Sequence, residues 1–538
     1  MLSVLLASAS LCAAAYRGVP TPAHQFVPAS THRTCGRCVA CAQAEARPTA
    51  PPGPPPFTTG YEAVKEQPFD GWFADAAATS PAPSSPMLAP LRAAAAAALP
   101  TIYFPGRKDE PFRRCDLSSL QASRLVPSVA KDASAAAALA VCSDADSAGM
   151  RLVLVDGVCS QALSDLSALP EGVSVSSLNT TSGAALDGAL AALQGPLPES
   201  GANTAAAMNT LLGVYGFAAL NQASLADVCV INVPKGVTIE RPLHVVLLSS
   251  GGVAAAPMQA PGTEGAAPVL PASHPNLLVS LAEGASLKLA QHYFACDAQA
   301  PYLCNGVTRV QLGRSATLQH SYVQEQGRMS IHFDSVLVDV GAGASYSSTM
   351  LQSGGRIART NHLVELTGEK ASSNLRALSM AAEAQLVDVH SKVVHVSGEC
   401  TSQQEQRNVV AGRSRVVWKG AVVVPRGSDN TNAKQLCRTL LLSDDARVDV
   451  QPTLEIDTDE VECTHGATIS DLDDEMVFYL QARGLSRPDA RALLLSGWVR
   501  DALALVPSES VKQRAVARAA KVGADYDKEV RRSGLSSI

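Results

Sequence analysis

Short apolar runs of the kind that forms β-strands fill the chain from Val228 to Leu442. Most runs are roughly four to eight residues long, many alternate apolar with polar positions, and Gly or Asn lies between them. Examples are VCVINV, NLLVSLA, VTRVQL and RVVWKGAVVV. Few helical patterns interrupt this succession before Asp471. We therefore expect a mainly β core over residues 227–470, with a surface loop in the Ala-, Pro- and Gly-rich insert Gly251–Ser273.

A loose repeat within this core indicates a solenoid. The segments AEGASLKL, LGRSATLQ, VGAGASYS and GEKASSNL each place an alanine before an alternating run. These alanines, Ala285, Ala316, Ala344 and Ala371, are 31, 28 and 27 residues apart. A repeat of about thirty residues built of short strands is typical of stacked coils, with the small residues at the turns. A β-sandwich is the alternative, but its Asn-Gly and Asp-Gly hairpin turns are scarce here.

Helical patterns flank the β core on both sides. After it, DLDDEMVFYLQARGL and SRPDARALLLSGWVRDALALV predict two helices joined at Gly484, and the tail predicts a polar third helix. Residues 471–538 are therefore expected to form a helical domain. Before the core, residues 101–226 combine a strand pattern, RLVLV, with an Ala- and Leu-rich helical stretch that begins near Asp187. This region is expected to be an α/β domain.

The first hundred residues have a composition of their own. Up to Ala44 the chain contains no Asp or Glu, while three arginines lie among many Ala, Ser and Thr. This composition is typical of an organellar transit peptide, which we expect over residues 1–45. A secretory signal is the alternative, because LSVLLASASLCAAA is apolar, but its start carries no basic side chain. Residues 46–100 are rich in Pro and Ala and are expected to be a linker with two short helices.

Composition narrows the classes of function. With 538 residues the chain can hold two or three domains, and its net charge of −6 gives no reason to expect nucleic acid as a partner. No apolar run reaches the length of about 18 residues that a membrane span needs. The 13 cysteines are mostly scattered, which indicates reduced thiols. The spaced run Cys35, Cys38 and Cys41 falls inside the expected transit peptide.

The candidate chemistry lies in EVECTHGAT, at the end of the predicted β core. The stretch alternates like a strand, so Cys463 and His465 are expected on one face. A thiolate and an imidazole two residues apart suit iron, zinc or an iron–sulphur cluster. The alternative is that Cys463 is a small buried hydrophobe and His465 a hydrogen-bonded core histidine. Gly466 is expected to end the strand.

A second set of possible ligands consists of His390, His395 and Cys400. The segment SKVVHV alternates, however, so we expect these residues to belong to strands with a polar outer face rather than to a metal site. The remaining histidines of the core are weaker candidates still: His292, His320, His332 and His362.

The C-terminal motif EIDTDEVECTHGATISDLDDEMVFYLQARGL, followed by ARALLLSGWVRDAL, resembles the signature of the SufD family. Members are non-catalytic subunits of the SufBCD iron–sulphur cluster assembly scaffold. FAALNQASLADVCVINVPKGVTIERPLHV, DVHSKVVHVSGECTSQQ and TNAKQLCRTLLLSDDARVDVQPTLEI resemble the family as well, so the resemblance covers most of the chain beyond the N-terminal region. The sister subunit SufB has a cysteine within the stretch that reads SDDARVD here and a glutamate after the histidine. Ala446 and Gly466 therefore favour SufD.

The resemblance implies a right-handed parallel β-helix core and a location in the plastid stroma. It also implies pairing with SufB through the end of the β-helix. The chain lacks the phosphate loop G-x-x-x-x-G-K-[ST], so we expect it to bind no nucleotide. The C-terminal helices have a surplus of apolar surface, and the resemblance implies that this surface docks the SufC ATPase. The alternative is that it packs against the end of the β-helix. We do not expect an enzyme.

A cluster commonly needs four protein ligands, and this chain offers the pair Cys463 and His465. The remaining ligands would come from another subunit, which the resemblance identifies as SufB, so iron or a cluster would be transient and shared with it. His465 is the more direct ligand, because the family motif retains this histidine in both sister subunits. One alternative is a SufB-like primary scaffold, which Ala446 disfavours. The other is a carbohydrate-active β-helix enzyme, for which clustered carboxylates are missing.

Overall fold

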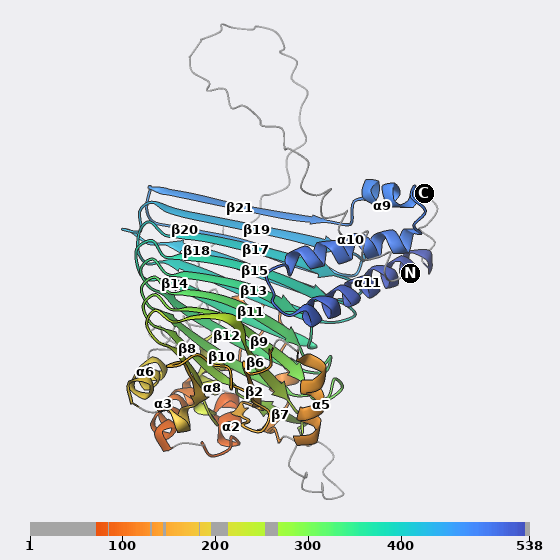
Figure 1. Ribbon diagram of the computed structural model, residues 1–538. Helices are drawn as coiled ribbons and strands as arrows, with labels where there is room; N and C mark the ends of the chain where they lie inside the picture. Colours follow the sequence, from red (N-terminus) through yellow and green to blue (C-terminus); the bar gives the residue numbers. More distant parts are fainter. Residues whose placement is uncertain are drawn as a thin grey trace, which may run out of the picture. The chain divides into compact units, whose positions relative to one another are not determined.

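Two parallel sheets form the core of the structure, and successive strands of the chain alternate between them (Figure 1). The first sheet contains β5 (Cys229–Val233), β8 (Asn276–Leu281), β10 (Leu303–Leu312), β12 (Ile331–Val340), β14 (Ile357–Leu366), β16 (Leu386–His395), β18 (Arg415–Val424) and β20 (Arg447–Ile456). The second contains β6 (Thr238–Ser249), β9 (Ser286–Ala295), β11 (Thr317–Glu325), β13 (Ser345–Gln352), β15 (Ser372–Ala381), β17 (Thr401–Val410), β19 (Thr431–Leu441) and β21 (Val461–Ser470). Each coil adds one strand to each sheet, which makes a parallel β-solenoid of about seven turns. The prediction of a mainly β, parallel β-helix core is confirmed.

This computed structural model describes residues 71–83, 86–129, 132–143, 147–181, 183–194, 214–252 and 267–532. The expected transit peptide and the Cys35, Cys38 and Cys41 run lie outside the described residues. So does the proline-rich first part of the expected linker.

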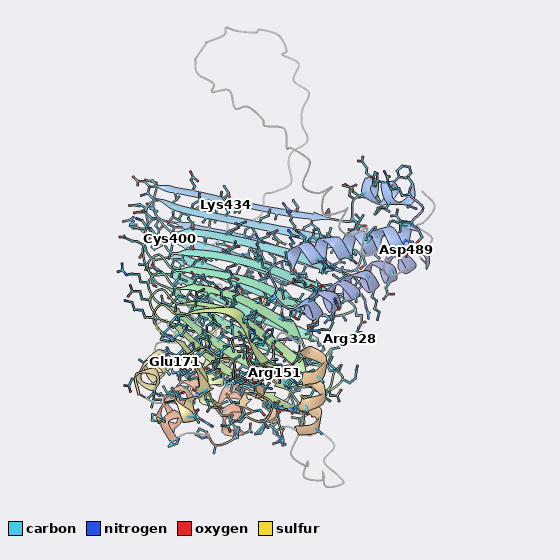
Figure 2. The ribbon with its side chains drawn as sticks, in the orientation of Figure 1. Arg151, Glu171, Arg328, Cys400, Lys434 and Asp489 are labelled. Carbon is cyan, nitrogen blue, oxygen red and sulfur yellow. The ribbon has the colours of Figure 1, made fainter. Side chains whose placement is uncertain are left out.

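A small buried residue fills the turn before most strands of the second sheet. Four of these residues are the alanines of the sequence repeat, each at most 1% exposed: Ala285, Ala316, Ala344 and Ala371. Cys400 takes this place in the next coil, directly before β17 (Figure 2). Its thiol lies 3.3 Å from the Gly368 carbonyl oxygen and 3.4 Å from the Gly398 carbonyl oxygen, so these two acceptors share its one S–H. The repeat therefore marks stacked turns, as predicted, and Cys400 is a buried turn residue.

The N-terminal region extends both sheets and adds helices. Its strands are β1 (Arg124–Pro127), β2 (Arg151–Val155), β3 (Val158–Cys159), β4 (Ser174–Ser177) and β7 (Val269–Ser273). Its α-helices are α2 (Trp72–Ala78), α3 (Ala89–Ala98), α4 (Ser118–Gln121), α5 (Asp132–Cys142), α6 (Gly183–Gln194) and α8 (Tyr215–Ala223). β4 pairs antiparallel with β5, and β2 pairs parallel with β6. This α/β region is thus continuous with the first coils of the solenoid.

Two expectations for the N-terminal half need correction. The two short helices expected within residues 46–100 are present as α2 and α3, but the described part of this range is packed rather than a free linker. Phe73 is buried against Phe217 of α8, and the Phe217 ring stacks on Phe333 of β12 with 4.0 Å between centroids. Residues 253–266 of the insert expected to be a surface loop lie outside the described residues, and its last five residues form β7, which pairs with β1 and β10.

Three helices close the chain: α9 (Asp474–Gln481), α10 (Arg487–Ala502) and α11 (Glu509–Arg532). The Asp473 side chain caps α9, and the Ser486 side chain caps α10. Gly484 has a φ of 89°, which suits a glycine after a helix end. α10 and α11 lie across the second sheet (Figure 1), where Leu495 and Val499 pack with residues of its strands. The predicted helical hairpin and tail helix are therefore present.

Candidate functional site

The paired candidates Cys463 and His465 lie on β21, the last strand of the second sheet. β20 ends the first sheet, and in the described part of the chain neither strand has a neighbour on its outer side. Most side chains of β21 are exposed, whereas the inner strands are largely buried. Unpaired strand edges offer backbone N–H and C=O groups to another chain. The two candidates therefore stand at an open end of the solenoid.

β21 is longer than the sequence pattern predicts. It runs through Gly466 and continues to Ser470. Gly466 pairs with Leu436, and a Cβ at Gly466 would lie 3.5 Å from the Leu436 side chain, an ordinary contact. The strand continues past Gly466 and has room for a side chain there. The expectation that Gly466 ends the strand is therefore wrong.

Cys463 turns toward the interior of the last coil. It is half-buried and packs with Val422, Val424 and Ala433. Burial raises the pKa of its thiol, an effect that a backbone hydrogen bond with Ala433 offsets only in part. The thiolate is the form that binds metals, so a raised pKa weakens a cysteine as a ligand. The packing alternative therefore describes Cys463 in the free chain.

His465 is exposed, in contrast to Cys463, so it is not a core histidine. The two residues are two positions apart on one strand and share a side of it, as the alternation predicts. The described residues contain no group of three or more His, Cys, Asp or Glu side chains that could hold a metal ion. A metal ion or cluster bound at His465 therefore needs further donors from outside the described chain.

Gln435 of β19 is a neighbour of His465 that the sequence analysis missed. The two residues pair directly in the ladder between β19 and β21. The repeat spacing could have identified this neighbour. Gln435 precedes His465 by 30 residues, within the 27 to 31 residues that separate the repeat alanines. One coil length backward from a site residue gives its neighbour in a solenoid.

Three of the remaining histidines are hydrogen-bonding groups inside the solenoid. The Tyr322 hydroxyl lies 2.8 Å from His332 Nε2, and the Tyr346 hydroxyl lies 3.0 Å from ring nitrogens of both His320 and His362. Burial lowers the pKa of His320 to about 4 and the pKa values of His332 and His362 to about 3. These rings are therefore neutral near pH 7 and act as core residues.

His390 and His395 are not on an exposed polar face, so that expectation is wrong; both are buried. His395 points into the solenoid, where Nε2 lies 2.9 Å from the Ser402 hydroxyl. His390 lies on the outer side of the first sheet in a buried ion network. Its Nε2 is 2.9 Å from Asp388, and Asp388 accepts from Arg359 at 2.8 Å. Arg359 also donates to the backbone carbonyl of Pro111, so the N-terminal segment around Pro111 covers this network.

Among the described residues, the large apolar side chains that α9, α10 and α11 leave exposed all belong to α9. Leu495 of α10 and Leu503 at the end of that helix are buried in the cluster that joins α10 and α11 to the second sheet, so packing accounts for that part of the expected surplus. Met476, Phe478 and Tyr479 of α9 remain exposed, Phe478 by 72%. We call these three residues the α9 patch. Large apolar side chains left exposed together on one short helix are a candidate protein interaction site.

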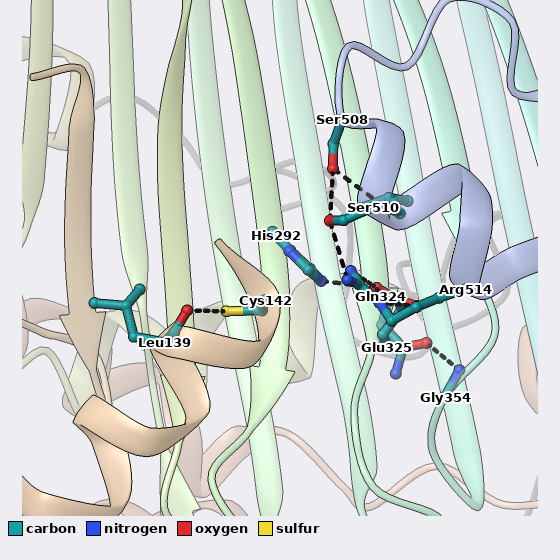
Figure 3. A network of polar contacts seen from close by, with 10 residues as sticks. Leu139, Cys142, His292, Gln324, Glu325, Gly354, Ser508, Ser510 and Arg514 are labelled. Atoms are coloured by element: carbon teal, nitrogen blue, oxygen red, sulfur yellow. Dashed lines mark hydrogen bonds and ion pairs between the residues drawn. The ribbon is translucent and has the colours of Figure 1, made fainter. Parts of the chain in front are cut away.

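A charged contact fastens α11 to the second sheet (Figure 3). The Arg514 guanidinium donates to both oxygens of the Glu325 carboxylate, at 2.7 to 3.2 Å, and His292 Nε2 lies 3.0 Å from the same group. Burial by itself raises the pKa of Glu325, but His292 and Arg514 outweigh it and lower that pKa to about 2. No local sequence pattern indicates this contact, because Glu325 and Arg514 are 189 residues apart.

The nine cysteines among the described residues are all free thiols. No helix among those residues combines the length and the apolar character that crossing a membrane requires.

Two family models match the chain. The N-terminal region of SufBD proteins matches residues 63–245, and the SufBD core domain of the SUF system for FeS cluster assembly matches residues 263–498. The second match contains the whole of β21 and α9.

Individual relatives agree with these models. The chloroplastic protein ABCI7 of Arabidopsis thaliana is 29% identical over 448 residues, which cover 82% of this chain and 87% of the relative. An iron–sulphur cluster assembly SufBD family protein of Synechocystis is 29% identical over 432 residues, 79% of this chain and 88% of the relative. The iron–sulphur cluster assembly protein SufD of Escherichia coli is 29% identical over 243 residues, 45% of this chain and 56% of the relative.

Proposed function

The chain belongs to the SufBD family of iron–sulphur cluster assembly proteins, and from this premise we propose that it is a SufD-like scaffold subunit. In this proposal it pairs with SufB, docks the SufC ATPase and has no catalytic activity of its own. Iron or a nascent cluster is its cargo, held transiently at His465 with Cys463 beside it. The observation that carries the proposal is the position of these two donors at the open end of the solenoid.

Pairing with SufB is supported by the free edges of β20 and β21. Another chain can add strands to such edges, because backbone hydrogen bonds then continue across the junction. Ile456 and Ile469, at the ends of these strands, are exposed large apolar side chains that a partner would cover. A second SufBD-type solenoid has the matching architecture for an end-to-end contact.

Sharing of the cargo follows from the number of donors. Cys463 and His465 supply two, and clusters are commonly held by four. SufB would supply the remaining ligands across the junction. Contact with a positive iron centre also favours the thiolate of Cys463, which counters the rise in its pKa caused by burial.

Docking of SufC is supported by the α9 patch. The chain has no phosphate loop, so ATP hydrolysis in this proposal is supplied by another subunit. The α9 patch lies next to the end of β21, because only Asp471, Leu472 and Asp473 separate the strand from α9. A nucleotide-driven movement at α9 would therefore act close to His465.

The two alternatives are less well supported. Ala446, which precedes β20, is buried beside Trp418 and Cys437, so this chain has an apolar residue in the stretch where the SufB pattern has its cysteine. A carbohydrate-active enzyme does not fit a chain that the two SufBD models match over most of its length. A location in the plastid is supported by the chloroplastic relative and by the acid-free N-terminal composition; we propose the stroma.

Co-purification tests this proposal. The full chain is expressed with SufB and SufC of the same source, and the bound subunits are identified by mass. Wild type should retain both. Ile469→Asp should lose SufB and keep SufC, while Phe478→Asp should do the reverse. A wild-type chain that retains neither subunit would overturn the proposal.

A further inference from the structure

Gln435 has a carboxamide that the free chain leaves without a hydrogen bond. Its side chain is 3% exposed, and neither Oε1 nor Nε2 has a hydrogen-bond partner in the described part of the chain. Gln404 takes the same ladder position one coil earlier and is satisfied at both ends. It accepts from the Ser391 hydroxyl at 2.7 Å and donates to the Ala421 carbonyl at 3.0 Å. Buried amides are normally hydrogen-bonded, so we expect Gln435 to gain a hydrogen-bond partner that it lacks in the isolated chain.

The position of Gln435 identifies that partner. Gln435 pairs directly with His465, and neighbouring strands lie about 4.8 Å apart. Ala433 and Cys437, two positions to either side of Gln435, are buried on the inner side of β19. The Gln435 amide therefore lies on the inner side too, next to the position of the His465 ring. No other described residue continues the sheet beyond His465.

We propose that Gln435 is a positioning residue for His465. Its Oε1 accepts the N–H of one imidazole nitrogen and leaves the other nitrogen directed outward to bind iron. A metal-binding histidine usually donates its second ring N–H to an oxygen acceptor, which fixes the tautomer and the ring orientation. The β19–β21 ladder already fixes both backbones, so only side-chain rotation is needed. The Nε2 amide group of Gln435 remains free to donate. Hydrogen bonds to cluster sulphur are one means by which proteins set the reduction potential of a cluster.

This inference rests on the proposed function, since it states how His465 is held when it binds iron. It differs from a role in folding in a way that can be measured. An unpaired buried amide is unfavourable for the folded chain, whereas an apolar group of similar size is not. Gln435→Leu should therefore leave the melting temperature unchanged or raise it, while it weakens iron binding.

The test uses the full chain co-expressed with SufB and SufC. We expect Gln435→Leu to lower the iron and acid-labile sulphide retained by the purified complex about tenfold, the lower end of the range for lost partners of metal ligands. Gln435→Glu keeps an acceptor oxygen and should restore most of the iron. Lys434→Ala changes the exposed neighbour on the same strand and should leave iron content unchanged.

The outcomes separate this inference from the proposal on which it rests. If His465→Ala loses iron while Gln435→Leu retains it, the positioning role is refuted and the site stands. If Gln435→Leu loses iron and also melts well below wild type, Gln435 is a structural residue and the inference fails. If His465→Ala retains wild-type iron, the proposed site itself is wrong.

Discussion

Removing the Arg514 side chain should release α11 from the solenoid without unfolding the coils. The fall in the pKa of Glu325 from an ordinary 4.5 to about 2 measures how strongly the folded chain favours its charged form. At about 1.4 kcal/mol for each tenfold change in ionisation, this fall corresponds to about 3 kcal/mol. His292 and Arg514 together cause this fall in the pKa of Glu325. Arg514→Met removes one partner and leaves a buried carboxylate with His292 alone, so we expect it to cost about 2 to 3 kcal/mol.

Hydrogen–deuterium exchange of the α11 amides is the suitable assay, because the helix can open locally while the strands stay protected. A loss of about 2 to 3 kcal/mol should speed exchange in α11 by about 30- to 150-fold at pH 7, with little change in β12 or β14. Lys521→Met is the matched control, because it removes a positive charge from an exposed position of the same helix. Unchanged exchange in α11, or an equal change in the control, would refute the reasoning.

The pH dependence gives the contact a second signature. The folded pKa of Glu325 is lower than its ordinary value, so its contribution is complete above about pH 5 and is lost as the pH falls toward 2. Wild-type α11 should therefore lose protection on acidification, after correction for the intrinsic exchange rate. Arg514→Met has less of this contribution to lose and should respond less.

Two further predictions concern the α9 patch and the N-terminus. Phe478→Asp should weaken SufC binding at least tenfold in a titration and leave the melting temperature within about 1 °C, because the side chain is exposed; Val158→Asp, an exposed apolar position in the N-terminal region, is the control. N-terminal sequencing of the protein from isolated plastids should place the mature start between Ala40 and Ala50, and a start near Ala15 would instead indicate secretion.

The sequence predicts the solenoid well because a coil is a local unit with its own pattern. Ala285 and its equivalents are buried at successive turns, so their spacing reports the coil length directly. The strand that carries Cys463 and His465 is predicted for the same reason, since alternation is a local property. The end of that strand is not, because Gly466 permits a break without requiring one and the ladder with β19 decides the outcome.

What the sequence does not predict depends on contacts between distant segments. Phe73 reads as part of a Pro- and Ala-rich linker, yet it is buried because α8 and β12 supply a surface for it. His390 reads as an outer-face residue, yet the N-terminal segment covers it. Gln435 has no distinguishing motif, and its importance appears only when the next coil places His465 beside it.

The central claim is that His465 binds the cargo, and the metal content of the assembled complex tests it most directly. The full chain, with His465→Ala or with Thr464→Ala as the matched control on the same strand, is co-expressed with SufB and SufC and purified without oxygen. Iron and acid-labile sulphide are then measured per complex. The account predicts that His465→Ala assembles with both partners but loses iron and sulphide at least about tenfold, while Thr464→Ala matches wild type. Wild-type iron and sulphide in the His465→Ala complex would contradict it.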